Sequence, residues 1–472
     1  KVETIVEEHL YKGRVVDSLV ASSKELTGKI AWLSARKGTL PAEQRIVLRR
    51  AGRIDPTSLE DYIVNDGYQS IAKVLAEMTP QGVIDELKKS NLRGRGGAGF
   101  PTATKWGFVA KEPKGKKYVV CNADESEPGT FKDRLILEGD PHSIIEAMLI
   151  AGYAVGADAG YIYIRGEYTL ALQRLQNAIA QAKEIGMLGE DILGSSFNFE
   201  LHLHSGAGAY ICGEETALLE SIEGNRGQPR TRPPFPTTSG LWGKPTLINN
   251  VETLANVPPI LLFGADWFKK FGTPSSPGTK VYTILGNVNV TGLIEVPMGI
   301  TLREVIAFYA QGMKLGHTFK MAQTGGSSGS IIPSSLQDTP MDFDSFSKVG
   351  VSLGSGALLI CDEEVCVVDL AKVLLQFFRN ESCGKCFPCR IGTQRSYEIL
   401  EEIAQGRGTE QSLKDLLTLA DHMYGLSNCG LGQTAGTPLK DILNYFRAEV
   451  DAHVKLGVCP AGVCEMTVPV LV

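Results

Sequence analysis

Residues 92–102 read Leu92-Arg-Gly-Arg-Gly-Gly-Ala-Gly-Phe-Pro-Thr102 and carry four glycines within six positions. A backbone with so few side chains can adopt positive φ angles and bring its N–H groups close to a ligand. The spacing Gly94-x-Gly96-x-x-Gly99 matches a dinucleotide-binding fingerprint, which also requires a strand directly before the glycines. Residues 80–90 instead have the pattern of an amphipathic helix. An ordinary Rossmann site is therefore disfavoured, and a flexible surface turn stays open as the alternative.

The composition is that of an ordinary globular protein. The 472 residues are 43% hydrophobic and 21% charged, and a chain of this length folds into roughly two to four domains. A net charge of −6 gives no electrostatic reason to expect nucleic acid as a partner. No apolar run approaches the ~20 residues of a membrane span, so no membrane insertion is expected. The first residues lack both a signal-peptide core and an initiator Met, which suggests a fragment or a processed form.

The cysteines are concentrated near the end of the chain. Eight of the ten follow residue 360. Thiols clustered in this way more often bind metal than form disulfides in a reducing compartment. We therefore expect a cytoplasmic metalloprotein.

Strand and helix patterns alternate from about residue 91. Strands are predicted at 117–121, 161–164 and 197–204, and helices at 144–155, 170–182 and 211–222. This alternation predicts a mostly parallel sheet covered by helices. Ligands bind at the carboxyl ends of such strands, and polar loops begin there at Asn122 and Ser205.

Two further units are predicted after a proline-rich exit near residue 236. Strands at 280–285 and 294–296 and a helix at 302–309 predict a small α+β module. The pattern after residue 366 is helical, over 367–380, 391–405, 410–424 and 437–455. Four helices of this length predict a bundle.

Two loops after strands are candidate ligand sites. The first, Cys121-Asn-Ala-Asp-Glu-Ser-Glu-Pro-Gly-Thr130, places three carboxylates together, as hydrogen-bond acceptors for a ligand or as solvated acids at a helix start. The second, Ser205-Gly-Ala-Gly-Ala-Tyr-Ile-Cys-Gly-Glu-Glu-Thr216, puts glycines and two carboxylates at a helix N-terminus, where N–H groups attract anions. A tight strand–helix connection would explain its glycines but not its paired carboxylates.

The run Ser382-Cys-Gly-Lys-Cys-Phe-Pro-Cys-Arg390 has the spacing C-x2-C-x2-C, and Cys429 stands alone further on. Zinc sites usually draw their ligands from two separated pairs. Three thiolates in one loop with a distant fourth suit a [4Fe–4S] cluster better. A zinc-bound scaffold remains the alternative.

These four runs, in this order, resemble the NADH-binding flavoprotein subunit of respiratory complex I. Related subunits occur in NAD-linked hydrogenases, formate dehydrogenases and electron-bifurcating enzymes. The resemblance covers about residues 50–455. It implies an α/β fold: a Rossmann-like FMN-binding domain, a small β-grasp α+β module and a C-terminal four-helix bundle carrying an Fe–S cluster. It also implies an enzyme that moves a hydride from NADH to FMN and electrons singly to the cluster.

The resemblance implies a role for individual residues. FMN would be bound by Gly94, Arg95, Gly96, Lys105, Asn122, Asp124, Glu125, Ser126, Tyr210, Gly213, Glu214, Asn249 and Asn250. NADH would contact Glu127 and Glu215, with Phe100, Phe108 and Phe235 stacking on its rings and Arg232 standing where the family has a lysine. The cluster would be ligated by Cys383, Cys386, Cys389 and Cys429. No side chain is expected to act as a catalytic acid or base, but Arg93 or Arg95 would favour an anionic reduced flavin.

The predicted boundaries follow the same resemblance. They give a helical lead-in at 1–75, an FMN and NADH domain at 76–246, a β-grasp module at 247–335, a cluster-bearing bundle at 336–456 and a tail at 457–472. Residues 5–14 resemble the end of a thioredoxin-like [2Fe–2S] domain, which would precede this chain or be a separate subunit. A larger iron–sulfur subunit would complete a multi-subunit complex, cytoplasmic or peripheral on the cytoplasmic face of a membrane complex.

Three points stay open. The chain is either an active NADH:acceptor oxidoreductase subunit, with or without electron bifurcation, or a relay subunit that keeps the fold and has lost nucleotide turnover. Cys459 and Cys464, with His453, form either half of a metal site or a pair of structural thiols. Cys361 and Cys366 are expected to be buried core residues rather than ligands.

Overall fold

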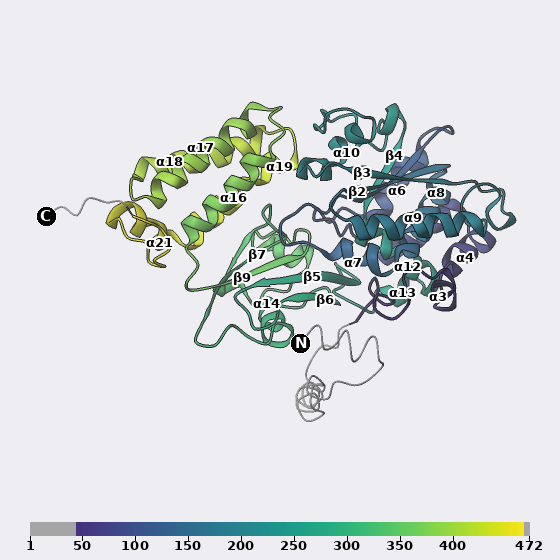
Figure 1. The fold of residues 1–472 in the computed structure, drawn as a ribbon, viewed down its shortest axis with the longest axis horizontal. Helices are drawn as coiled ribbons and strands as arrows, with labels where there is room; N and C mark the ends of the chain where they lie inside the picture. The colour runs from purple at the N-terminus through teal and green to yellow at the C-terminus, as the bar shows by residue number, and fades with distance from the viewer. Residues whose placement is uncertain (1–43, 467–472) are drawn as a thin grey trace, which may run out of the picture. The chain divides into compact units, whose positions relative to one another are not determined.

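A computed structural model describes residues 44–466 of the chain (Figure 1). Its first sheet has four parallel strands in the order β3-β2-β1-β4. The strands are β1 (Tyr118–Ala123), β2 (Ala159–Arg165), β3 (Glu200–Gly206) and β4 (Thr246–Asn250). The register pairs Cys121 of β1 with both Ile162 and Asn249. The predicted parallel sheet is therefore confirmed.

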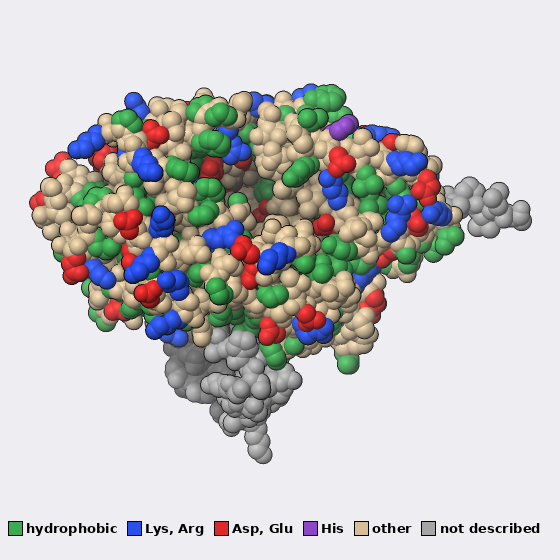
Figure 2. Space-filling model, turned by 180° about the vertical axis from the view of Figure 1, so that it is seen from behind, with side chains coloured by type: hydrophobic (Ala, Val, Ile, Leu, Met, Phe, Trp, Pro, Cys, Tyr) green, Lys and Arg blue, Asp and Glu red, His purple; other side chains and the backbone are tan. Residues whose placement is uncertain are grey.

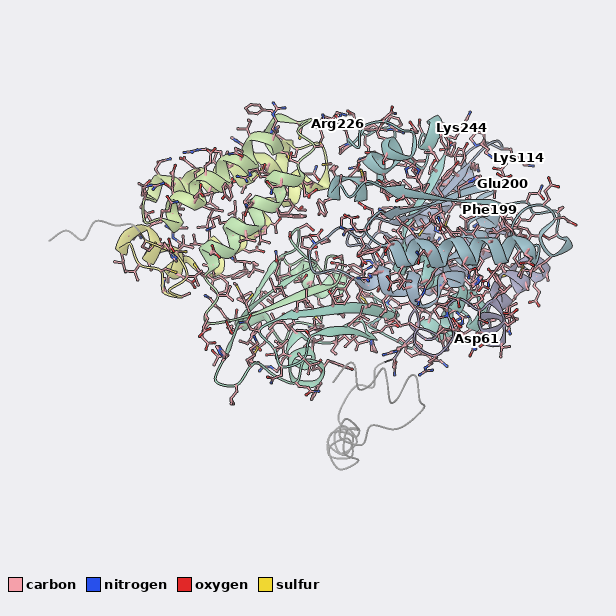
Figure 3. The ribbon with its side chains drawn as sticks, viewed as in Figure 1. Asp61, Lys114, Phe199, Glu200, Arg226 and Lys244 are labelled. Atoms are coloured by element: carbon pink, nitrogen blue, oxygen red, sulfur yellow. The ribbon has the colours of Figure 1, made fainter. Side chains whose placement is uncertain are left out.

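Helices cover this sheet, and the most central of them is α8 (Pro141–Val155), whose residues are almost all buried. The other helices of this part are α3 (Leu59–Val64), α4 (Gln69–Glu77), α5 (Pro80–Ser90), α6 (Thr102–Lys111), α7 (Lys132–Gly139), α9 (Thr169–Glu184), α10 (Glu215–Ile222), α11 (Val251–Ala255), α12 (Val257–Phe263) and α13 (Ala265–Phe268). Phe199, directly before β3, fills the space beside Gly152 and Gly160, where a side chain would collide with its ring (Figure 3). The glycine-rich loop 92–101 follows helix α5, as predicted.

The predicted boundary between residues 246 and 247 needs correction because it cuts through β4. This strand pairs with β1, and α11 to α13 pack into the same core as α4, α5 and α8. This strand has only a weak sequence signal, because Thr246-Leu-Ile-Asn-Asn250 is short and follows a run of prolines and glycines. The first domain thus continues to about residue 271.

The second sheet has five strands in the order β6-β5-β9-β7-β8. They are β5 (Thr279–Gly286), β6 (Gly292–Pro297), β7 (Phe319–Thr324), β8 (Ile331–Pro333) and β9 (Ala357–Asp362), accompanied by α14 (Leu302–Glu304), the π-helix η6 (Val305–Tyr309) and α15 (Phe343–Lys348). β9 is the central strand and pairs parallel with β5. The predicted boundary at 335/336 therefore also needs correction, because it separates β9 from its sheet.

The C-terminal part is helical. It contains α16 (Val367–Glu381), α17 (Phe387–Ala404), α18 (Glu410–Leu426), α19 (Gly430–Thr434), α20 (Thr437–Tyr445), α21 (Arg447–Asp451) and the π-helix η8 (Ala452–Leu456). Contacts of α16 with α17, α17 with α18, α18 with α20 and α20 with α16 close a bundle of four helices. The single helix predicted at 437–455 is interrupted at Phe446.

Short 3₁₀ turns account for the remaining differences. The helix predicted at 211–222 divides into η4 (Tyr210–Gly213) and α10, because Glu214 is extended and caps α10 with its side chain. Other such turns are η3 (Ile192–Gly194), η5 (Leu241–Gly243) and η7 (Ser334–Leu336). The lead-in predicted at 1–75 lies mostly outside the described residues, and so does the end of the predicted tail. Within residues 44–466, none of the helices combines the length and apolar character of a bilayer span.

Candidate functional site

Segments that follow three of the parallel strands meet at one edge of the first sheet. The acidic loop, residues 124–127, follows β1; the second glycine loop, residues 206–213, contains the end of β3; and α11 follows β4. Asn122 at the end of β1 donates a hydrogen bond from Nδ2 to the Gly213 carbonyl oxygen, at 2.8 Å. Ligands bind at this edge of a parallel sheet, so the predicted loops meet where a ligand is expected.

A cavity of about 810 Å³ opens at this edge, and small-molecule sites have volumes of this order. The face in Figure 2 is hollowed near its centre, with acidic and basic side chains around the hollow. The cavity lining includes eighteen of the nineteen residues that the sequence predicted for the flavin and the nucleotide. These are Gly94, Gly96, Phe100, Lys105, Phe108, Asn122, Asp124, Glu125, Ser126, Glu127, Tyr210, Gly213, Glu214, Glu215, Arg232, Phe235, Asn249 and Asn250.

Arg95 is the predicted residue that does not line the cavity. Its fully buried guanidinium donates to the carbonyl oxygens of Thr279, Pro277 and Arg93 at 2.7–3.1 Å. Its backbone N–H donates to Thr253 Oγ1 at 2.8 Å. Arg93 pairs instead with Asp344 at 2.8 Å. The two arginines thus anchor the first glycine loop, and the prediction that they act on the flavin directly has no support in their contacts.

Asp124 contains an unsatisfied oxygen at the cavity. Its Oδ1 accepts a hydrogen bond of 3.0 Å from Ser126, while its buried Oδ2 has no partner. Burial raises the pKa of Asp124 to about 7. A buried acceptor without a donor is unfavourable, so this oxygen is suited to accept a hydrogen bond from a ligand hydroxyl group.

Glu125 is occupied by the protein itself. Its carboxylate accepts hydrogen bonds from the backbone N–H groups of Asp133 and Arg134, at 2.8 and 2.9 Å. Burial, together with the neighbouring Asp133, raises the pKa of Glu125 to about 7. The side chain therefore ties the acidic loop to the start of α7 as well as lining the cavity.

Glu127 joins three parts of the chain. It accepts hydrogen bonds from the Tyr210 hydroxyl at 2.7 Å and from the Ser328 N–H and hydroxyl at 2.9 and 3.0 Å. Burial raises the pKa of Glu127. Ser328 belongs to the turn after β7, so the second sheet completes one wall of the cavity.

The paired carboxylates at the start of α10 have different partners. Glu214 accepts from the N–H groups of Thr216 and Ala217 at 2.9 and 3.0 Å, and its other oxygen lies 3.7 Å from Arg232. Glu215 pairs with the Lys105 ammonium group. Both of the predicted cations at the cavity therefore already face a carboxylate.

Lys132 is a cavity residue that the sequence analysis missed. Its buried ammonium lies 2.6 Å from Asp133 and 3.0 Å from Glu252. Glu252 is also 2.5 Å from the buried Lys280. The sequence offered no signal for this network, because Lys132, Glu252 and Lys280 lie far apart in the chain and share no motif.

The second sheet also contributes Gly325 and Gly354 to the cavity wall. Their backbones approach so closely that a Cβ atom on Gly354 would lie 2.4 Å from the Gly325 Cα, and both have positive φ angles. Only glycine meets both conditions. Two glycines of the second sheet are therefore part of the site.

The four predicted cluster cysteines lie at the end of the bundle nearest the cavity. All belong to one buried group with Leu431 and Phe378, in which Cys389 and Cys429 are the most buried of the four. Burial, with the Cys386, Cys429 and Cys383 thiols nearby, raises the pKa of Cys389 to about 12.

The spacing of these thiols is wider than zinc requires. Among the described residues, no three of the four sulfur atoms all lie within 4.8 Å of one another. Zn–S bonds of 2.3 Å in a tetrahedron would place the sulfur atoms about 3.8 Å apart. The wider arrangement favours a four-iron cluster over the zinc alternative.

The cluster cysteines are linked to the cavity by short contacts. Gly430 and Leu431, directly after Cys429, line the cavity. On the other side, Arg226 from the loop after α10 donates to the Cys383 carbonyl oxygen at 3.0 Å (Figure 3). Lys385 donates to the Pro229 carbonyl oxygen at 2.6 Å. The bundle is therefore fixed against the first domain on both sides of the four thiols.

The first sheet is parallel and Rossmann-like, and a cavity lies at its carboxyl edge. A second sheet and a cysteine-bearing bundle close this cavity. Together these features define a nucleotide-binding iron–sulfur flavoprotein. Family models agree: the Nuo51 FMN-binding domain matches residues 87–259, and the NADH-ubiquinone oxidoreductase-F iron-sulfur binding region matches residues 369–453. The chain belongs to this family of NADH-binding FMN and iron–sulfur subunits, found in complex I and NAD-linked hydrogenases. In it, electrons pass from NADH through FMN to an iron–sulfur cluster.

Similar proteins support the assignment over most of the chain. NADP-reducing hydrogenase subunit HndC of Solidesulfovibrio fructosivorans is 52% identical over 420 residues, 89% of this chain and 85% of that protein. An NADH-quinone oxidoreductase subunit of Rhizobium meliloti is 48% identical over 415 residues, 88% of this chain and 99% of that protein. A crystal structure of an NAD⁺-reducing [NiFe]-hydrogenase in the H₂-reduced state matches with a TM-score of 0.76 and 34% identity, over 91% of this chain and 73% of that one.

Proposed function

We propose that the cavity binds FMN at its inner wall and the nicotinamide nucleotide on its open side. FMN, when bound, supplies the two-electron chemistry with the nucleotide and the one-electron chemistry with the cluster. The chain positions both rings and excludes water from between them. The observation that carries the proposal is the adjacency of the cavity and the thiols: Gly430 and Leu431, the two residues directly after the proposed cluster ligand Cys429, line the cavity.

The inner wall suits FMN. The first glycine loop packs closely against the end of β4, since a Cβ atom on Gly96 would lie only 3.0 Å from the Asn250 Cβ. The unpartnered Oδ2 of Asp124 would accept a hydrogen bond from a ribityl hydroxyl. Trp106 donates from Nε1 to Asn249 Oδ1 at 2.9 Å, which fixes the Asn249 amide beside the ring site. The predicted FMN residues are retained in this proposal, except that Arg95 acts by holding the loop.

The open side suits a dinucleotide. Phe100, Phe108 and Phe235 line the cavity yet are 45%, 49% and 55% exposed. Exposed aromatic rings at a cavity mouth are available for stacking on a base or a nicotinamide. Glu127, Glu215 and Arg232 line the same cavity, where they would orient the nucleotide riboses and phosphates.

The cluster end suits a larger iron–sulfur subunit as the next electron acceptor. Phe387, Tyr424 and Leu426 are 66%, 67% and 64% exposed, and they stand next to Cys386 and close before Cys429 in the chain. Exposed apolar groups that gather beside a functional centre favour a docking surface. This subunit would belong to a cytoplasmic complex of the NAD(P)-linked hydrogenase kind, as the similarity to HndC supports. A thioredoxin-like [2Fe–2S] subunit or domain is the second proposed partner.

A stopped-flow experiment tests the proposal. NADH is mixed anaerobically with the purified chain loaded with FMN and iron, and the flavin and iron–sulfur absorbance changes are followed together. We expect both to bleach in the native chain, while Cys386→Ser keeps the flavin change and loses most of the iron–sulfur change. Cys121→Ser, a buried thiol of β1, is the matched control and behaves as the native chain. A native flavin that NADH does not reduce would instead favour the relay alternative.

A further inference from the structure

Two serine hydroxyl groups lie beside the four cluster thiols, and neither has a role in the site described above. Ser382 directly precedes Cys383 in the C-x2-C-x2-C run, and Ser427 stands two residues before Cys429. Ser427 is buried and Ser382 is partly buried. Both hydroxyl groups are therefore largely shielded from solvent at the end of the bundle that carries the thiols.

The Ser382 hydroxyl contacts one of these thiols directly. Its Oγ lies 3.3 Å from Cys389 Sγ, and the Gly384 N–H donates to the same Oγ at 3.3 Å. A thiolate that binds iron has no proton to give, so the hydroxyl is the donor to sulfur in this contact. Burial raises the pKa of Cys389 and the Ser382 hydrogen bond lowers it. This opposition is what a donor that stabilises negative charge on the sulfur produces.

The Ser427 hydroxyl is buried and has no hydrogen-bond partner among the described residues. Its backbone is held on both sides, since the N–H donates to the Met423 carbonyl oxygen at 3.2 Å and the carbonyl oxygen accepts from Gln433 Nε2 at 3.0 Å. The hydroxyl lies close to a cluster cysteine, because a Cβ atom on Gly432 would be 2.5 Å from Ser427 Oγ and 2.9 Å from Cys389 Cβ. A buried hydroxyl without a partner is unfavourable, so this one fits a site that a cluster with acceptor sulfurs completes.

We infer that the Ser382 and Ser427 hydroxyl groups donate hydrogen bonds to sulfur atoms of the bound [4Fe–4S] cluster and thereby raise its reduction potential. The inference rests on the proposed ligation of the cluster by the four cysteines. Reduction adds negative charge to the cluster, so a hydrogen bond to sulfur stabilises the reduced form more than the oxidised form. The two serines thus make the cluster a better electron acceptor, and they do so through its sulfur atoms rather than by contact with a substrate.

The same bundle contains a matched control serine. Ser396 on α17 is fully buried, and its hydroxyl also has no hydrogen-bond partner among the residues that the structure describes. It follows Cys389 by seven residues, which corresponds to about 10 Å along the helix axis. Its hydroxyl is therefore out of hydrogen-bond reach of the Cys389 sulfur, although its burial is similar to that of Ser427.

A redox titration of the purified, cofactor-loaded chain tests the inference. Electron paramagnetic resonance measures the fraction of reduced cluster against the solution potential, so the readout does not depend on turnover. We expect Ser382→Ala and Ser427→Ala each to lower the ratio of reduced to oxidised cluster at a fixed potential about tenfold, a shift of about 59 mV for a one-electron couple. Ser382→Thr keeps a hydroxyl and should titrate like the native chain, and so should Ser396→Ala.

Iron content and the resonance signal distinguish this inference from the proposed function. A native chain that lacks the iron and the signal of a reduced [4Fe–4S] cluster would overturn both. Normal iron content with an unchanged potential in an alanine variant would overturn the inference for that serine alone. A shift in Ser382→Ala that also persists in Ser382→Thr would overturn it for Ser382, since the loop rather than the hydroxyl would be responsible. Ser427→Ala removes a group without a described partner, so its fold is expected to be retained.

Discussion

The Tyr210 hydroxyl donates a hydrogen bond of 2.7 Å to the Glu127 carboxylate, and this bond joins the loop after β3 to the loop after β1. The same carboxylate accepts from Ser328 of the second sheet. Three strand ends that are distant in sequence are thus held in one arrangement at the wall of the cavity. The first prediction concerns this bond.

Replacing Tyr210 by Phe keeps the ring and removes the donor. Burial already raises the pKa of Glu127, and the lost hydrogen bond raises it further. The carboxylate is then protonated at a higher pH, so KM for NADH should rise about tenfold near neutral pH and return toward the native value as the pH increases. KM is measured against pH with an acceptor that reacts at the flavin. Tyr397→Phe on α17 is the control, and a KM unchanged at every pH would contradict the assignment.

Replacing Lys132 by Met removes the cation between Asp133 and Glu252. Two buried carboxylates then lose a partner, and the free energy of unfolding should fall by about 3–5 kcal/mol. Urea denaturation measures the loss. Lys114→Met, at an exposed site that does not line the cavity (Figure 3), should change stability by less than about 0.5 kcal/mol. Equal stability of the two variants would show that the network contributes nothing.

Replacing Asp124 by Asn should stabilise the flavin-free protein while weakening flavin binding. Burial raises the pKa of Asp124 from 3.8 to about 7, so the folded state binds the proton more tightly than the unfolded state does. The carboxylate therefore lowers the free energy of unfolding more and more as the pH rises from 4 to 7. Above pH 7 this penalty stays constant. The variant should gain up to about 4 kcal/mol at pH 8 and almost nothing at pH 4. Thermal unfolding of flavin-free protein at both pH values measures this, and a gain independent of pH would contradict it.

Replacing Phe235 by Ala should raise KM for NADH about tenfold and leave the FMN content unchanged, since the proposed stacking contact is worth about 1 kcal/mol or somewhat more. Phe263→Ala is the matched control, because this side chain is 45% exposed and lies outside the cavity. Steady-state kinetics and flavin absorbance separate the two effects. Loss of FMN from the Phe235 variant would place this ring in the flavin site instead.

Much of the fold could be predicted because its signals are local. The apolar run of α8, the buried strand patterns of β1 and β2 and the amphipathic helix α5 each depend on neighbouring residues. β4 and β9 were missed for the opposite reason. Each is short and bounded by glycines or prolines, and each is a strand only because a distant partner, β1 or β5, supplies its hydrogen bonds.

In the candidate site, too, some features have local sequence signals and others depend on distant residues. The glycine loops, the acidic loop and the C-x2-C-x2-C run are contiguous motifs, so their chemistry is legible in the sequence. The separate roles of Arg95 and Lys132 cannot be predicted from the sequence. Arg95 stands between the glycines and yet points away from the cavity, while Lys132 has no motif and lines it.

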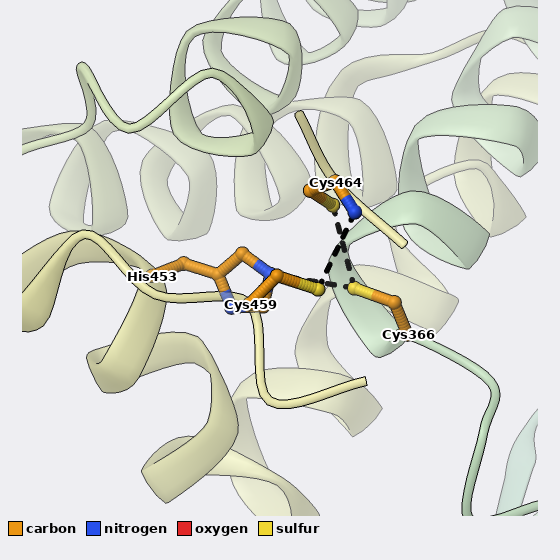
Figure 4. Close-up of side chains that lie close together, drawn as sticks. All are labelled: Cys366, His453, Cys459 and Cys464. Atoms are coloured by element: carbon orange, nitrogen blue, oxygen red, sulfur yellow. Dashed lines mark hydrogen bonds between the residues drawn. The ribbon is translucent and has the colours of Figure 1, made fainter. Parts of the chain in front are cut away.

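The sequence by itself determined the kinds of groups that the chain brings to its ligands: glycine-rich backbone, clustered carboxylates and four cluster thiols. Only the tertiary structure decided which of them face one cavity, which cation is buried beside it, and that Cys366 meets His453, Cys459 and Cys464 (Figure 4). The physical reason is that residue chemistry and short-range spacing are properties of the chain, whereas proximity between distant residues is set by the packing of whole strands and helices.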